Sequence, residues 1–475
     1  MKTKIFYILT AVTLSLGLTA CGAKSDSKKS VKGTLVVPLA SQKVIAKVLK
    51  KASGVHFKEA CPNVPAGYKP LKGVKVEFVD SGNKTVEDTK TNNCGEFSAS
   101  VPEGVVKVKA KSSGNKELIT DVSVFQSTGA TALASTIPSN AEYQISSIQM
   151  TADNKVAFSV TDTVTNNAVI GIPNSALSAK INTNNVGISK LESAANISDP
   201  ASVTLVMDAS GSMQRSVFDK DNKELIDAKG YSINRFRVSH LAAHTYLNNT
   251  PKVDETGFII FSNTVNFLND ETLKTLFPAM KDMNDSPTTY VFSKSGYSKE
   301  ASKLRLLVDA YNPYSTLYRA NGMDDKHKNS PNVKLGRYPW GSSTALFNAT
   351  REGISRTSKR TNSRKLVIVM SDGINNRSPY SVNTVIDLAK EKAIPVHTIA
   401  FGGGSDERIM KRIANETNAS FYKAIGIDLV AAFRSIQTSI TFQYLANLIN
   451  KAKTGDKVTI SLNYNGAKVS RTVTR

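Results

Sequence analysis

The sequence is poor in cysteine and histidine, and this scarcity limits what can hold the fold together. Only 3 cysteines and 5 histidines occur among 475 residues. Three thiols cannot build a disulfide-dense scaffold or a four-thiolate zinc site. The only apolar run that approaches membrane length lies at the extreme N-terminus, which excludes a polytopic membrane protein.

Acidic residues are also few relative to basic ones. The chain has 61 Lys+Arg against 39 Asp+Glu, for a net charge of +22. Such a surplus favours anionic partners, but no recognised nucleic-acid module accompanies it, so we expect a dispersed lysine-rich surface and no nucleic-acid partner. The hydrophobic and charged fractions of 40% and 21% are those of a globular protein. The length predicts several domains, since one core rarely outgrows about 250–300 residues.

Catalytic arrangements are missing from the motif pattern. His240 and His244 are spaced one helical turn apart but lack the intervening glutamate of a zinc protease. The glycines at 402–404 are not followed by the lysine of a phosphate-binding loop. No Ser-His-Asp or Cys-His set is indicated by spacing. We therefore expect a binding protein and not an enzyme; a hydrolase would need an unrecognised catalytic insertion.

The N-terminus is predicted to be a targeting segment. Lys2 and Lys4 precede an apolar stretch at 5–18, and Cys21 follows small residues directly. This pattern resembles the bacterial lipobox, in which the cysteine is acylated and the chain is cut just before it. The alternative is an ordinary signal peptide with a cysteine near its cleavage site.

The lipobox resemblance implies a cell-envelope protein. Residues 1–20 would be a lipoprotein signal peptide, and 21–30 the lipidated Cys21 and a polar tether to the membrane. The residue after the cysteine is Gly22 and not an aspartate. In the Gram-negative sorting pattern that this resembles, such a residue indicates the outer membrane. The pattern leaves open whether the protein lies on the periplasmic face or on the outer surface of this membrane.

Residues 31–128 are predicted to form an all-β sandwich. The segments 74–79, 97–101 and 105–109 alternate with the period of a half-buried strand. The stretches around them resemble the prealbumin-like β-sandwich of carboxypeptidase regulatory domains, which implies a spacer.

Cys61 and Cys94 are the only cysteines left after lipidation. In an exported protein, two thiols inside one small β-module are most simply a disulfide. A metal-binding pair assisted by His56 is the alternative.

Two further β segments flank the centre of the chain. Residues 140–197 are strand-like but too few for a core of their own. Residues 455–475 have the pattern of a β-hairpin whose turn is Asn465-Gly466. We expect the hairpin to pair with 140–197, which would make the intervening domain an insertion in one sandwich.

Residues 198–453 alternate apolar strands with amphipathic helices, which predicts a doubly wound, Rossmann-like parallel α/β sheet. The expected strands are 203–207, 257–261, 365–370 and 395–400. The expected helices are 236–247, 345–356, 382–393, 407–417 and 428–452.

Oxygen-bearing side chains follow the expected strands, where ligands of such sheets bind. They are Asp208, Ser210 and Ser212 after the first strand, Asp372 after the 365–370 strand, and Thr344 at the start of a helix. Carboxylates and hydroxyls without thiolate or imidazole suit a hard divalent cation, Mg²⁺ first and Mn²⁺ or Ca²⁺ next.

These five residues, in this order, resemble the metal-ion-dependent adhesion site of the von Willebrand factor A (VWA) domain. The resemblance implies that the serines and the threonine contact the ion, that the aspartates act largely through water, and that a ligand's carboxylate fills the open position. It therefore implies adhesion or ligand binding to a protein or other acidic ligand. One alternative is a periplasmic scaffold for assembly of an envelope complex; another is a site that is vacant or only structural.

The chain departs from the family in an insertion at 265–340. Two helical pieces, 271–282 and 301–311, precede a polar loop that carries Tyr338 and the only tryptophan, Trp340. Because this loop leads to Thr344, it is a candidate ligand surface. The alternative is a lid that covers the sheet edge.

Overall fold

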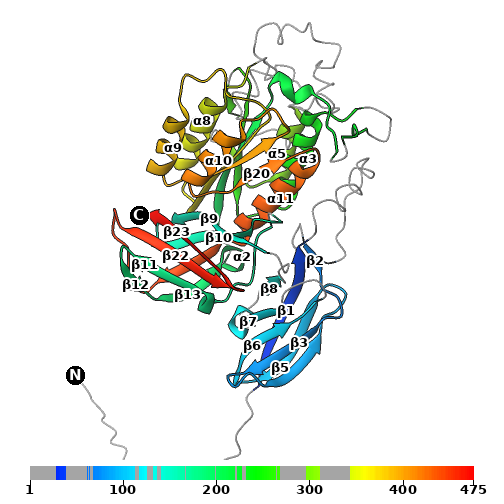
Figure 1. The fold of residues 1–475 in the computed structure, drawn as a ribbon, viewed down its shortest axis with the longest axis vertical. Coiled ribbons are helices and arrows are strands. Elements are labelled where there is room, and N and C mark those ends of the chain that lie inside the picture. The colour runs from blue at the N-terminus through cyan, green and yellow to red at the C-terminus, as the bar shows by residue number, and fades with distance from the viewer. Residues whose placement is uncertain are drawn as a thin grey trace, which may run out of the picture.

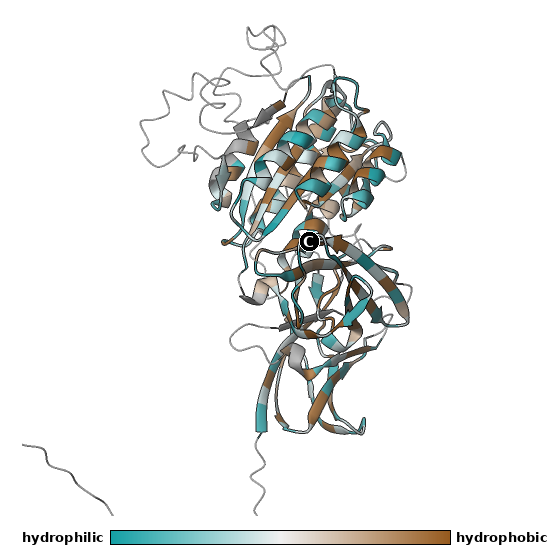
Figure 2. Ribbon diagram, turned by 90° about the vertical axis from the view of Figure 1, so that its left-hand side faces the viewer, coloured by the Kyte–Doolittle hydropathy of each residue, from teal (hydrophilic) through white to brown (hydrophobic). Residues whose placement is uncertain are grey.

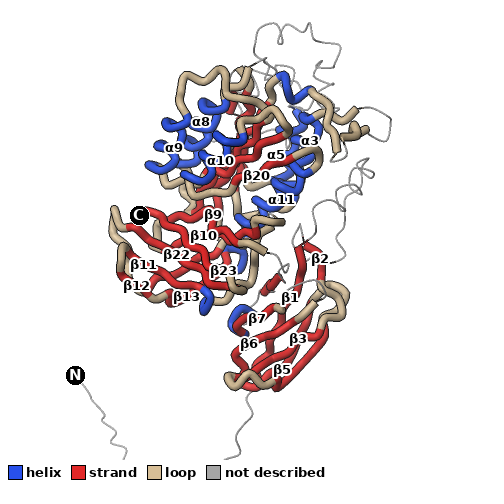
Figure 3. Tube along the Cα trace, in the orientation of Figure 1, coloured by secondary structure: helices blue, strands red, loops and turns tan. Residues whose placement is uncertain are grey.

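The computed structural model shows three bodies, two all-β sandwiches and one α/β domain (Figure 1). It describes residues 28–38, 61, 64, 68–112, 117–125, 132–135, 141–165, 167–197, 199–219, 222–226, 232–263, 265–267, 296–310 and 343–475. The predicted fold class, an α/β doubly wound domain with all-β modules before it, is confirmed. Figure 3 shows the long helices gathered in the α/β domain, whereas the two sandwiches consist mainly of strands and loops.

The N-terminal sandwich packs two sheets around a core that includes Phe78, Phe97 and Val108. One sheet has the order β2 (Tyr68–Pro70), β1 (Lys28–Pro38), β5 (Glu96–Pro102), with β8 (Ala132–Ser135) paired to β1. The other has the order β4 (Thr85–Lys90), β3 (Lys75–Asp80), β6 (Val105–Ala110), β7 (Leu118–Asp121). A short 3-10 turn, Val122–Phe125, follows β7.

The N-terminal sandwich contains the predicted disulfide and has wider bounds than expected. The Cys61–Cys94 disulfide is present. Strand β1 already begins at Lys28, within the predicted tether, because its first residues pair with the end of β5. Strand β8 pairs with β1, so the sandwich extends beyond residue 128. Cys21 lies outside the described residues.

The second sandwich is built from segments far apart in the sequence. One sheet has the order β13 (Ile188–Ser193), β21 (Tyr444–Leu448), β10 (Lys155–Asp162), β9 (Tyr143–Met150). The other has the order β12 (Asn184–Val186), β11 (Leu177–Ile181), β22 (Lys457–Tyr464), β23 (Ala467–Thr474). The terminal hairpin therefore pairs with β11, in the register Ala179↔Ile460. Its turn residues Asn465 and Gly466 have φ of 49° and 80°, as the tight Asn-Gly turn requires.

The α/β domain is inserted between β13 and β21 of that sandwich. Its sheet has the order β16 (Val265–Phe267), β15 (Glu255–Phe261), β14 (Ala201–Asp208), β18 (Arg364–Ser371), β19 (Val396–Phe401), β20 (Phe421–Ala424), with β17 (Tyr297–Ser298) on β15. Strands β15, β14, β18, β19 and β20 are parallel, whereas β16 and β17 are antiparallel.

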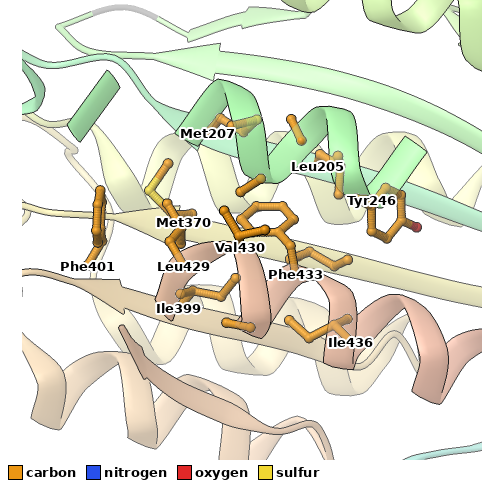
Figure 4. Packing of buried hydrophobic residues seen from close by; sticks show 14 of the residues in the cluster. Leu205, Met207, Tyr246, Met370, Ile399, Phe401, Leu429, Val430, Phe433 and Ile436 are labelled. Carbon is orange, nitrogen blue, oxygen red and sulfur yellow. The ribbon is translucent and has the colours of Figure 1, made fainter. Parts of the chain in front are cut away.

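Helices cover both faces of this sheet, so its strands are buried on both sides. Figure 2 shows hydrophobic residues, in brown, along strands of this domain. Strand residues such as Leu205 and Ile399 face α3 (Arg235–Asn248), α5 (Ala301–Ala310) and α11 (Asp428–Thr441). Figure 4 shows Phe433 and Val430 of α11 inside this core. The opposite face packs on α8 (Leu346–Ser358), α9 (Val382–Glu391) and α10 (Glu407–Glu416).

The predicted helix 428–452 is wrong beyond Thr441. Residues 444–448 instead form β21, the strand between β10 and β13, so the α/β domain ends before residue 453. The apolar run of β21 continues directly from an amphipathic helix, and periodicity alone does not distinguish the two. Of the predicted helical pieces in the insertion, 301–311 corresponds to α5, and 271–282 lies outside the described residues.

Arg364 hydrogen-bonds to both segments in which the chain passes between the second sandwich and the α/β domain. It is 1% exposed, and its guanidinium donates to the Asp199 carboxylate at 2.9 Å and to the Ile440 carbonyl at 2.7 Å. Nearby, His397 Nε2 lies 2.7 Å from Ser147 Oγ of β9. Since Nδ1 of His397 accepts from the Ser420 N–H, Nε2 carries the proton and donates to Ser147. Burial lowers the pKa of His397 to about 3, so it stays neutral.

Among the described residues, no helix is long and apolar enough to span a bilayer.

Deleting residues 455–475 is expected to destabilise the second sandwich. The deletion removes the buried side chains of Val458, Ile460 and Leu462, each worth about 1.5–3 kcal/mol, and leaves β11 paired with β12 alone. Hydrogen exchange should therefore speed up across β9 to β13. Unchanged exchange there would show that the hairpin is an independent tail.

Candidate functional site

The predicted site residues lie where parallel strands end. Strand β14 ends at Asp208, and its neighbour β18 ends at Ser371, one residue before Asp372. The two strands are paired up to Met207 and Met370, so both carboxylates lie at the same edge of the sheet. Side chains from separate segments can therefore meet there, as is usual for such sheets.

Asp208 is buried at the end of β14 with both carboxylate oxygens bonded. The Ser210 N–H donates to Oδ1 at 2.7 Å, and the Ser371 hydroxyl donates to Oδ2 at 2.5 Å. Only 1% of Asp208 is exposed. Burial, and then the charge of Asp372, raise the pKa of Asp208 to about 6, against the two hydrogen bonds. The negative charge of the Asp208 carboxylate therefore lowers the stability of the folded protein.

Asp372 is buried between a hydroxyl and an arginine. The Ser212 hydroxyl donates to Oδ1 at 2.6 Å, and Arg235 Nη1 donates to Oδ2 at 2.7 Å. The Ser210 and Ser212 hydroxyl oxygens are 3.0 Å apart. Ser212 lies in the 3-10 turn Gly211–Gln214, which follows β14 at once. This short turn brings Ser212 to the aspartate of the neighbouring strand.

Thr344 is fixed just before α8 by two hydrogen bonds between its backbone and Asn376 in the loop after β18. Its N–H donates to Asn376 Oδ1 at 2.7 Å, and the Asn376 N–H donates back to its carbonyl at 3.1 Å. A Cβ placed on Gly373 would lie 3.0 Å from the Thr344 hydroxyl. The absence of a side chain at Gly373 thus lets this hydroxyl lie beside the residue next to Asp372.

The structure brings all five predicted site residues to one place, with two carboxylates and three hydroxyls. This donor set fits a hard divalent cation, for which oxygen is the preferred ligand. Within the part of the chain that the structure describes, no group of three or more His, Cys, Asp or Glu could hold a metal. Any cation at this edge would therefore depend on the serine and threonine hydroxyls. Tyr338 and Trp340 lie outside the described residues.

Sequence reasoning missed two groups that contact the aspartates. Ser371 was visible as the residue before Asp372, but nothing showed that it bonds Asp208. Arg235 opens α3, after the Asn234 side chain that caps the helix by accepting from the Arg237 N–H. No spacing in the sequence links Arg235 to Asp372, because the contact joins residues 137 positions apart.

Comparison with known families identifies the α/β domain. Residues 316–429 match the family model of the von Willebrand factor type A domain. The match includes Thr344 and Asp372 but not the loop with Asp208, Ser210 and Ser212. Together with the parallel sheet covered on both faces, it shows that this chain contains a von Willebrand factor type A domain.

Several solved structures show low similarity to this chain. BatB from Bacteroides thetaiotaomicron is 12% identical, with 51% of this chain and 97% of that chain covered and a TM-score of 0.32. A von Willebrand factor type A protein from Catenulispora acidiphila is 9% identical, with 71% and 74% covered and a TM-score of 0.32. Proximal thread matrix protein 1 from the mussel byssus, with a zinc-occupied MIDAS motif, is 14% identical, with 53% and 48% covered and a TM-score of 0.31. No curated protein matches the chain.

Replacing Asp208 with asparagine is expected to stabilise the metal-free protein at pH 7.5. The pKa of Asp208 is raised from 3.8 to about 6 in the folded protein. The fold is therefore most stable at low pH, where Asp208 is protonated, and it loses stability as the pH rises through about 6 and the buried carboxylate ionises. The gain from Asp208→Asn should be at most about 3 kcal/mol and should shrink towards pH 5. Thermal unfolding in EDTA at both pH values measures it. A variant that is less stable at pH 7.5 would show that the burial cost is already compensated.

Proposed function

We propose that this protein binds a protein partner through a divalent cation held by Asp208, Ser210, Ser212, Thr344 and Asp372. The observation that carries the proposal is the linked set of oxygen atoms at the ends of β14 and β18. Mg²⁺ is the first candidate ion, with Mn²⁺ or Ca²⁺ as alternatives. The bound ion would offer a carboxylate of the partner an open coordination position.

The surroundings of the site favour a protein over a small anion as the partner. Among the described residues of this domain, each exposed large apolar side chain belongs to a segment that follows the carboxyl end of β14, β18 or β20. Ile374, the second residue after Asp372, is 59% exposed. The others are Phe218, Ile226, Tyr380 and Ile425. Exposed apolar groups at the same end of the sheet as a polar site favour an interaction surface for a protein.

Removal of the ion, or of its ligands, is expected to abolish partner capture. Full-length protein should capture its partner by crosslinking in Mg²⁺ but not in EDTA, and Asp208→Ala should fail in both. Thr344→Ala should weaken capture more than it changes thermal stability, because it removes one hydroxyl. Lys457→Ala on the second sandwich serves as a control that should bind normally. Equal capture by folded Asp208→Ala in EDTA would contradict a metal bridge.

The identity of the captured partner decides between two roles for the same site. Adhesion or ligand binding at the cell surface predicts host or environmental material. A periplasmic assembly factor predicts components of an envelope complex. Protease access in intact cells distinguishes the two faces.

We further propose that the protein is an outer-membrane lipoprotein anchored through Cys21. The support is the sequence pattern at 1–21, with its basic start, apolar run and terminal cysteine. The anchor would attach to the N-terminal sandwich, which would act as a spacer between the membrane and the VWA domain.

Cys21→Ser is expected to release the protein from the outer-membrane fraction. The substitution removes the thiol that would carry the lipid, while the folded domains begin further along the chain. Mass spectrometry of the membrane-bound wild type should show an acylated N-terminal cysteine. Retention of an unacylated Cys21→Ser protein in that fraction would rule out lipid anchoring.

A further inference from the structure

Arg235 is a fixed positive charge within the candidate metal site. Its Nη1 donates to Asp372 Oδ2 at 2.7 Å, and the side chains of Arg235 and Asp372 are 15% and 0% exposed. Its backbone is held as well, because the Arg235 N–H donates to the Arg215 carbonyl at 3.0 Å. This arginine is therefore part of the site and not a loose surface cation.

Gly402 provides the space in which this guanidinium lies. The residue follows β19 with a φ of +72°, in the left-handed region that favours glycine. A Cβ on Gly402 would lie 2.8 Å from Arg235 Cζ and 2.9 Å from Nη2. A side chain at this position would require the guanidinium to shift. The backbone after β19 thus helps to position Arg235, in addition to the residues that follow β14 and β18.

Arg235 changes the net charge of the site to which a cation would bind. Asp208 and Asp372 together carry two negative charges when ionised, and Arg235 offsets one of them. A divalent ion would then leave the occupied site with one net positive charge. Without Arg235 the same ion would be fully neutralised by the aspartates. A residual positive charge favours the approach of a carboxylate.

We propose that Arg235 is a built-in counter-charge that weakens cation binding at this site and keeps the occupied site positive. The inference rests on the proposed metal site. Arg235 acts through Asp372: it occupies Oδ2 while Ser212 occupies Oδ1, so both oxygens of that carboxylate already have partners. A cation must compete with the guanidinium for the negative charge of Asp372.

Titration of the full chain with Mn²⁺ by calorimetry tests this inference. Arg235→Gln removes the charge and keeps hydrogen-bonding capacity, so Mn²⁺ should bind about tenfold more tightly or better. Arg235→Lys keeps the charge and should stay within about threefold of wild type. The gain from Arg235→Gln should shrink as salt is raised, because screening weakens the repulsion between Arg235 and the ion.

Arg360→Gln is the matched control. Arg360 forms an equally short ion pair, 2.7 Å to Glu255, but Glu255 is the first residue of β15, at the opposite edge of the sheet. Its loss should leave Mn²⁺ affinity unchanged. If Arg235→Gln binds Mn²⁺ no more tightly than wild type, or Arg235→Lys binds as tightly as Arg235→Gln, the counter-charge role is wrong and the metal site stands. If wild type binds no Mn²⁺, the metal site and the inference both fail.

Discussion

Two buried carboxylates at neighbouring strand ends are the constraint on which the candidate site depends. A parallel sheet places Asp208 and Asp372 at the same edge, and burial makes their combined charge costly. The chain compensates with the hydroxyls of Ser371 and Ser212 and with the guanidinium of Arg235. This compensation is partial, because the pKa of Asp208 remains raised to about 6. A cation at this edge would remove the remaining cost.

The rest of the fold fixes this edge relative to the other domains. The VWA domain leaves the second sandwich after β13 and returns to it at β21, and Arg364 bonds both crossings. His397 adds a buried contact from β19 to β9. The N-terminal sandwich is joined to the second through Tyr68, whose hydroxyl donates to the Ala168 carbonyl. The candidate site lies at the carboxyl ends of the strands, whereas Arg364 and the sandwich contacts lie at their amino ends.

Much of the architecture follows from local sequence patterns. Continuous apolar strands such as 203–207 predict a sheet covered on both faces, and the Asn465-Gly466 turn predicts the terminal hairpin. The five oxygen-bearing residues were found because each follows a strand or opens a helix. Strand β21 was missed because its apolar run continues from α11, and its strand identity comes from pairing with β10 and β13. Arg235 was missed because its contact with Asp372 depends on the tertiary fold. The absence of a side chain at Gly402 leaves room for the guanidinium.

Diffraction from crystals grown with Mn²⁺ can show whether a divalent cation is held at the sheet edge. We expect an anomalous difference peak among the side-chain oxygens of Ser210, Ser212 and Thr344, beside the two aspartates. We also expect that the peak disappears from crystals of Asp208→Ala. A map without a peak at this edge, at Mn²⁺ concentrations that saturate ordinary divalent sites, would show that these residues do not hold a divalent cation.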